Sequence, residues 1–115
     1  MRSTPRFLQG AHPFTGAGLE KPVPLEGLPV YTVPDGARAQ AVYFRGGNST
    51  AELVSAVLVR DGVPMRWFPI GALGAVHVSL RIVEDIEAPS TVEVRVAAPE
   101  GVSGTLVVDL GLVEV

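Results

Sequence analysis

The sequence predicts an all-β protein, a small two-sheet antiparallel β-sandwich of the jelly-roll or Ig-like type. The first observation behind this prediction is alternation. Segments 75–83 and 91–97 switch between apolar and polar side chains at almost every position, as where His77 separates Val76 from Val78. Because successive side chains of a strand point to opposite faces, this period of two is typical of strands with one buried side and one solvent-facing side.

The second observation is the distribution of turn residues. The chain of 115 residues contains 13 glycines and 10 prolines, which leave little room for long helices. Asp61-Gly62 lies between two apolar segments and supplies the pair of residues that a type I′ hairpin needs at positive φ. A chain of this length is expected to form one domain with a substantial core.

We expect seven strands, at residues 28–33, 38–45, 52–60, 63–70, 75–83, 91–97 and 105–115. The connections between them are marked by turn chemistry at Pro34-Asp35-Gly36, Gly46 to Ser49, Asp61-Gly62, Gly71 to Gly74, the acidic crossing 84–90, and Pro99-Glu100-Gly101. Short strands at this spacing, separated by Gly and Pro, indicate two packed antiparallel sheets.

Residues 1–36 are expected to form an extended Pro/Gly-rich N-terminal arm, with a possible first strand at 28–33, ahead of a β-sandwich domain at 37–115. Six of the ten prolines fall in this arm. Because proline fixes φ and lacks an N–H, the segment should not be helical, and most of it should lie outside a sheet. It also contains too many large apolar side chains for a solvated tail, so we expect it to lie on an apolar surface.

Several of the expected strands are apolar on both sides. In segment 52–60, Val57 and Val59 share one side, while Val54 and Leu58 share the other. Such a strand is normally covered on both sides, but a two-layer sandwich has only one interior. The candidates for this cover are the N-terminal arm and another subunit. We therefore expect a homo-oligomer that forms through the N-terminal arm and the two-sided apolar strands, with an unidentified protein partner as the alternative. The expected interface residues are Phe7, Phe14, Leu19, Val54 and Leu58.

Charge and composition exclude several classes of partner. The net charge is −3 and no basic stripe is present, so we expect no binding to nucleic acid. The chain has no cysteine, which excludes disulfides and thiolate metal sites. The longest apolar stretches fall well short of the roughly 20 residues of a spanning helix, and no export signal is recognisable. We therefore expect a soluble, cytoplasmic protein that does not contact a membrane.

The sequence contains no recognisable catalytic motif. It lacks a phosphate-binding loop and a G-x-S-x-G motif, and its only histidines are His12 and His77. The acidic group at Glu84, Asp85 and Glu87 supplies too few oxygens for calcium without backbone help. We therefore expect no catalytic residue, no metal and no cofactor. Residues 48–50 match a glycosylation sequon, but turn chemistry is the preferred interpretation.

One polar and aromatic group is a candidate ligand site. Tyr43, Arg45, Arg66 and Trp67 are expected at the ends of neighbouring strands. Aromatic rings with arginine can stack a sugar or a planar anion, and they are equally enriched at protein interfaces. For Trp67, a position in the core is the alternative that we weigh most heavily.

These observations predict a non-enzymatic β-sandwich that acts as a structural, assembly or accessory subunit. The alternative is a small-ligand or carbohydrate-binding module that uses Tyr43 and Trp67. A third hypothesis is an enzyme whose site forms only between subunits.

Overall fold

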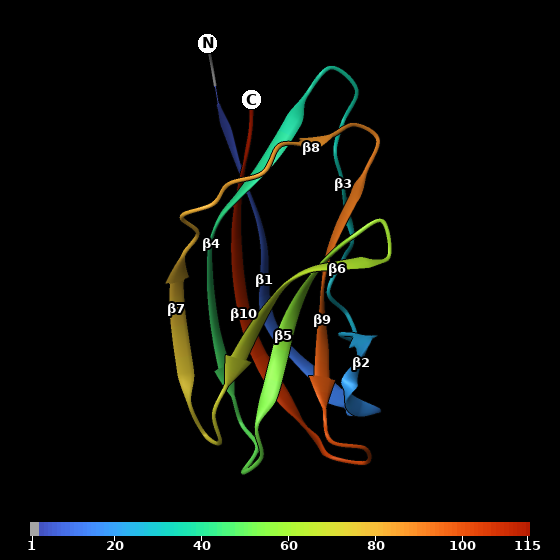
Figure 1. Ribbon diagram of the computed structural model, residues 1–115, viewed down its shortest axis with the longest axis vertical. Coiled ribbons are helices and arrows are strands. Elements are labelled where there is room, and N and C mark those ends of the chain that lie inside the picture. Colours follow the sequence, from blue (N-terminus) through green and yellow to red (C-terminus); the bar gives the residue numbers. More distant parts are fainter. Residues whose placement is uncertain (1–2) are drawn as a thin grey trace.

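The structure, a computed structural model, describes residues 3–115 and confirms the predicted fold class. Two antiparallel sheets pack face to face as a β-sandwich, and the described part of the chain begins and ends at the same end of the elongated molecule (Figure 1). Residues 3–115 contain no helix, and hence none there with the length and apolar character needed to cross a membrane.

Sheet A has the strand order β1-β10-β4-β7, with β8 paired to one end of β4. Its strands are β1 (Thr4–Thr15), β4 (Arg38–Asn48), β7 (Ala75–Ser79), β8 (Ile86–Glu87) and β10 (Ser103–Glu114). Strand β10 is the centre of this sheet, since it pairs with β1 along twelve positions on one side and with β4 on the other. A bulge between Gly111 and Leu112 shifts the register of the second pairing.

Sheet B has the order β2-β9-β5-β6, with β3 also paired to β9. Its strands are β2 (Gly18–Pro24), β3 (Tyr31–Thr32), β5 (Val54–Arg60), β6 (Val63–Ile70) and β9 (Thr91–Ala98). The hairpin between β5 and β6 turns at Asp61 and Gly62, whose φ angles are 50° and 79°. The predicted type I′ signal is therefore confirmed, because that turn needs positive φ at both central residues.

The core lies between the two sheets and is built from the inward side chains of both. Its centre is a stacked pair, Phe44 of sheet A and Phe68 of sheet B, with ring centroids 4.5 Å apart and planes at 11°. The core also contains fully buried aliphatic side chains from both sheets, among them Leu58, Ile70, Leu106, Leu110 and Leu112. Alternation along the strands places these side chains inside.

The expectation that most of residues 1–36 lies outside a sheet is wrong. Strand β1 pairs with β10 along its whole length, and β2 and β3 pair with β9. The physical reason is that β1 is an edge strand, which needs N–H donors on one lateral side only, so Pro5 and Pro13 are tolerated. The expected strand at 28–33 shrinks to Tyr31–Thr32.

Side-chain contacts fasten the N-terminal segment across the open side of the sandwich. The carboxylate of Glu114 on β10 accepts hydrogen bonds from the Tyr31 hydroxyl and from Arg6 Nε, the latter at 3.0 Å. These two donors lower the pKa of Glu114 below its usual value. Because Arg6 belongs to β1 and Tyr31 to β3, this one carboxylate connects the first strand of sheet A with an edge strand of sheet B.

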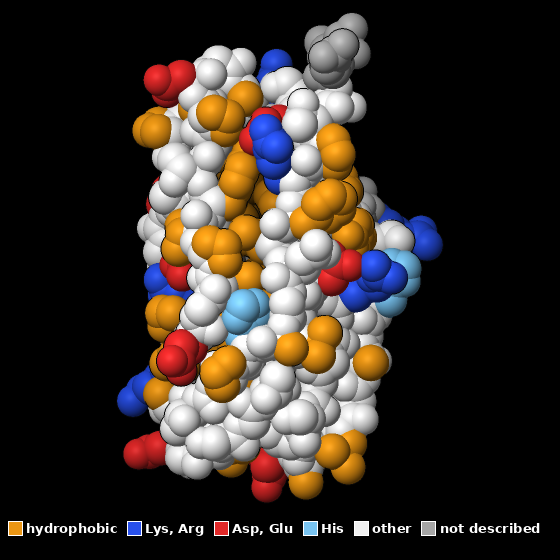
Figure 2. Space-filling model, turned by 180° about the vertical axis from the view of Figure 1, so that it is seen from behind, with side chains coloured by type: hydrophobic (Ala, Val, Ile, Leu, Met, Phe, Trp, Pro, Cys, Tyr) orange, Lys and Arg blue, Asp and Glu red, His pale blue; other side chains and the backbone are white. Residues whose placement is uncertain are grey.

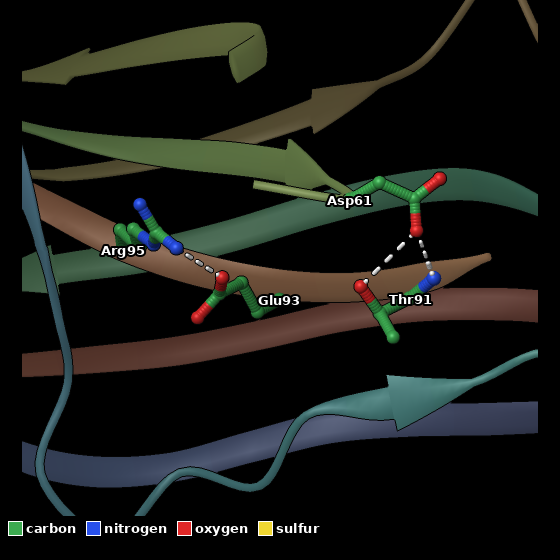
Figure 3. A network of polar contacts seen from close by, with 4 residues as sticks. All are labelled: Asp61, Thr91, Glu93 and Arg95. Carbon is green, nitrogen blue, oxygen red and sulfur yellow. Dashed lines mark hydrogen bonds and ion pairs between the residues drawn. The ribbon is translucent and has the colours of Figure 1, made fainter. Parts of the chain in front are cut away.

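The two-sided apolar character of β5 has an explanation within one chain. Val57 and Val59 point to the outer face of sheet B and are fully buried there, in a small cluster with Ala97. In register, Val57 lies between Trp67 and Arg95, and these long side chains cover it. Arg95 Nη2 is held at 2.6 Å from Glu93 Oε1 along the same face (Figure 3). The valines therefore need no separate covering element.

Asp61 joins the hairpin to β9 through its side chain. Its Oδ1 accepts a hydrogen bond from the Thr91 N–H at 2.8 Å (Figure 3). This bond to the charged form is the main cause that lowers the pKa of Asp61. A depressed pKa in the folded state means that the carboxylate stabilises the fold at neutral pH, and that this contribution is lost as pH falls below about 4.

We therefore expect Asp61→Asn to melt below the wild type at pH 6, with the difference shrinking toward pH 2. Asn tolerates positive φ and retains a side-chain oxygen, so the substitution removes mainly the charge. Melting temperatures measured between pH 2 and pH 7 by circular dichroism check this. A difference that is the same at every pH would contradict it.

Candidate functional site

The outer face of sheet A is the surface where exposed polar and apolar side chains meet. Strand pairing arranges it in rows that cross β1, β10, β4 and β7. The rows are Phe7, Gly111, Tyr43 and Ser79; then Gln9, Asp109, Arg45 and His77; then Ala11, Val107, Gly47 and Ala75. We call these twelve residues the sheet A face. Figure 2 views the molecule from this side and shows acidic, basic and histidine side chains together, with hydrophobic side chains around them.

The polar centre of the sheet A face is Asp109. Its Oδ2 lies 2.7 Å from Arg45 Nη2, and its Oδ1 accepts a hydrogen bond of 2.9 Å from the Tyr43 hydroxyl. The guanidinium of Arg45 also lies 5.5 Å from the centre of the Tyr43 ring, within the range of a cation–π contact. Partial burial, followed by the bond to Asp109, raises the pKa of Tyr43. The three groups therefore satisfy one another.

Gly111 determines how the Tyr43 ring lies. A Cβ atom built at Gly111 would be only 2.0 Å from a carbon of that ring, so the ring rests directly on the backbone of β10. His77 approaches the other side of Tyr43 edge-on, with ring centroids 6.3 Å apart and planes at 89°. The Tyr43 ring therefore lies across the sheet, over Gly111, instead of standing away from it.

Beside this cluster the surface is hollowed into a shallow, open depression of about 510 Å³. It is lined by small and apolar residues together with one ion pair: Gly46, Gly47, Ala75, Val76, Val107, Arg45 and Asp109. Each oxygen of Asp109 has a hydrogen-bond partner, Tyr43 for Oδ1 and Arg45 for Oδ2. In the part of the chain that is described, no group of three His, Asp or Glu side chains could hold a metal ion.

The predicted ligand constellation is not formed. Tyr43 and Arg45 lie on sheet A, whereas Arg66 and Trp67 belong to β6 of sheet B. Arg66 pairs with Glu84 of the long connection before β8. Trp67 is 45% exposed on the outer face of sheet B, so the alternative prediction, that Trp67 lies in the core, is also wrong. The sheet to which a strand belongs depends on the strands with which it pairs. Strands β4 and β5 follow each other in the sequence but belong to different sheets.

The expected interface residues divide into two groups. Phe7 and Leu19 are 52% and 45% exposed, and Phe7 is part of the sheet A face. Phe14, Val54 and Leu58 are buried within the chain itself and pack in the core between the sheets. The inner side of β5 therefore carries Val54 and Leu58, and their side chains are not available to a partner at the surface.

Sequence reasoning did not single out Asp109, the central residue of the cluster. A signal was present, because Asp109 is the only charged side chain between Ser103 and Val113 in a strand that is otherwise apolar or small. Asn48 was noted only as part of a turn and of a sequon, and its buried side-chain amide proves to donate to the backbone carbonyl groups of Glu52, Ile70 and Gly71.

Comparison with known proteins finds no family model that matches the chain and no matching curated protein. The functional inference therefore depends on the geometry described above.

Proposed function

We propose that the protein is a non-enzymatic structural or accessory subunit that associates with copies of itself through sheet A. The observation that carries the proposal is the character of the sheet A face. Phe7 and Val107 are both about half exposed; Val107 stands among the small residues Ala11, Gly47 and Ala75, and Phe7 lies beside Gly111. Large apolar side chains among small ones, around a neutralised polar centre, are the composition of an interface core more than of a catalytic cleft.

The state of the charged groups supports the same proposal. Arg45 and Asp109 neutralise each other, so covering them with another molecule does not leave a single buried charge. The Tyr43 hydroxyl already has an acceptor in Asp109. A partner that covers this face thus meets few unsatisfied polar groups, which favours a protein surface of similar composition. A cytoplasmic location is part of the same proposal and stays a prediction.

A second candidate function is the binding of a small ligand, and the depression beside Arg45 favours it. Its volume of about 510 Å³ lies within the range of ligand pockets. We prefer assembly because the depression is open and its polar rim groups are bonded to each other. A monomeric protein that binds a sugar or a small anion at Arg45 would favour the second candidate.

The test is the mass in solution, measured by light scattering over a range of protein concentrations. For the wild type we expect a multiple of the 12.1 kDa chain mass. The dissociation constant of Val107→Asp should be at least tenfold higher than that of the wild type. Val63→Asp is the matched control, because Val63 is similarly exposed but lies on β6 of sheet B. A wild type that stays monomeric at about 100 μM, a concentration at which even weak interfaces associate, would overturn the proposal.

A further inference from the structure

Among residues 3–115, strand β1 pairs in sheet A with β10 alone and leaves a long lateral edge of the sheet unpaired. It spans twelve residues, whereas the opposite edge strand β7 has five, and the edge strand β6 of sheet B is interrupted by Pro64 and Pro69. From Phe7 to Phe14 the strand contains no Asp, Glu, Lys or Arg. Long uncharged edges are templates for strand pairing, because their backbone N–H and C=O groups lack partners within the sheet.

The prolines of β1 show which residues present these groups. In an antiparallel pair, alternate residues bond to the neighbouring strand, and the others point their N–H and C=O away from it. Pro5 and Pro13 have no N–H to give to β10, so their positions are those that face the free edge. Phe7, Gln9 and Ala11 alternate along β1 in step with the two prolines, so their N–H and C=O groups also face the free edge. These three residues and the two prolines are all exposed.

These five positions are symmetric about Gln9. Pro5 and Pro13 each lie four residues from it, and Phe7 and Ala11 each lie two residues from it. A second copy that runs antiparallel, with a two-fold axis at Gln9, would therefore set Gln9 against Gln9 and Phe7 against Ala11. Pro5 would lie opposite Pro13 at both ends, where neither residue has an N–H to donate, so the ladder of backbone hydrogen bonds would end there.

The side chains along this edge suit the same register. The large Phe7 side chain would lie beside the small Ala11 of the second copy on the outer side, and on the inner side Leu8 would lie opposite Gly10. Large residues opposite small ones avoid a clash, and no like charges face each other within the paired segment. Three residue pairs, each exchanging two backbone bonds, supply roughly six hydrogen bonds.

We infer that β1 pairs antiparallel with β1 of a second copy, centred on Gln9, and joins two A sheets into one continuous sheet. The inference rests on the proposed function and adds a contact along the β1 edge to the proposed contact through the sheet A face. It also places the two sheet A faces side by side, with Phe7 of each copy at the junction. The prolines act as end stops that allow one register and limit the ladder to the segment between them.

The first experiment places single cysteines in a chain that has none, followed by treatment with a short bifunctional thiol cross-linker. Gln9→Cys should cross-link to its own copy. Phe7→Cys alone and Ala11→Cys alone should react at least tenfold more slowly. In each case the two cysteines of the paired copies would lie four residues apart along the strands, about 13 Å. An equal mixture of these two variants should cross-link efficiently, since position 7 faces position 11.

The second experiment removes one backbone donor. Gln9→Pro should raise the dissociation constant at least tenfold, while Gln9→Ala, which keeps the N–H, should change it less than threefold. A Gln9→Pro variant that does not fold would leave the cross-linking pattern as the deciding test.

The outcomes separate this inference from the proposed function. A wild-type oligomer in which Gln9→Cys does not cross-link, or in which Phe7→Cys alone reacts as fast as Gln9→Cys, overturns the β1 register and leaves assembly through sheet A standing. A monomeric wild type overturns both, and it identifies Pro5 and Pro13 as residues that protect the edge from pairing.

Discussion

Phe44→Ala is expected to lower the free energy of unfolding by about 3–5 kcal/mol, a large part of the 5–15 kcal/mol that domains of this size possess. The Phe44 side chain is fully buried between the sheets and stacks on Phe68. It also lies against Gly46, where a Cβ atom would be 2.7 Å from the ring. Two hydrogen-bonded sheets cannot move together to refill the space, so the cavity remains open.

Urea denaturation followed by circular dichroism measures this change. Ile82→Ala is the control, since Ile82 is 73% exposed and its truncation should alter stability by less than about 0.5 kcal/mol. Equal losses in the two variants would contradict the packing of Phe44 at the centre of the core. The comparison is best made at low protein concentration, so that association does not add to the measured stability.

Asn48→Asp is expected to cost about 3–5 kcal/mol at pH 7, although the two side chains have almost the same size. The Asn48 amide nitrogen donates to the carbonyl oxygens of Glu52, Gly71 and Ile70 at 2.8, 3.1 and 3.3 Å. Its Oδ1 accepts from the Thr50 N–H and hydroxyl, both at 2.9 Å. A carboxylate would turn an oxygen toward three carbonyl oxygens inside the protein, with no donor between them.

The loss should become smaller as the pH is lowered, because a protonated carboxyl group regains one donor. Denaturation of wild type and variant at pH 4 and pH 7 tests this. Asn48→Ala serves as the comparison, since it removes the same donors without adding a charge, and its cost should not depend on pH. A cost for Asn48→Asp that is equal at both pH values would show that the buried charge is not the cause.

Much of the fold could be predicted from local patterns. The strand expected at 63–70 has the observed bounds, and the segments at 38–45, 52–60, 91–97 and 105–115 each coincide with a strand to within a few residues. The Asp61-Gly62 turn was predicted for the reason that the structure confirms, positive φ at both residues. Alternation and turn chemistry act between residues close in sequence, so they can be read without knowing which strands pair.

The candidate site was predicted only in part. Tyr43 and Arg45 do contact each other, but the residue that organises them is Asp109, and Arg66 and Trp67 lie in the other sheet. The pairing of β4 with β10, more than fifty residues later, brings Asp109 to Arg45. A pattern within one strand contains no information on such a partner.

The amino-acid sequence by itself was sufficient for the all-β class, the positions of most strands and the hairpin, because those depend on side-chain period and on backbone preference at single residues. Two features depended on contacts between distant segments. Pro5 and Pro13 fit in a strand only because β1 lies at an edge, and Val57 could be buried on an outer face only because Arg95 and Trp67 flank it. Edge position, burial and sheet membership are properties of the packed molecule, and they follow from which strands become neighbours.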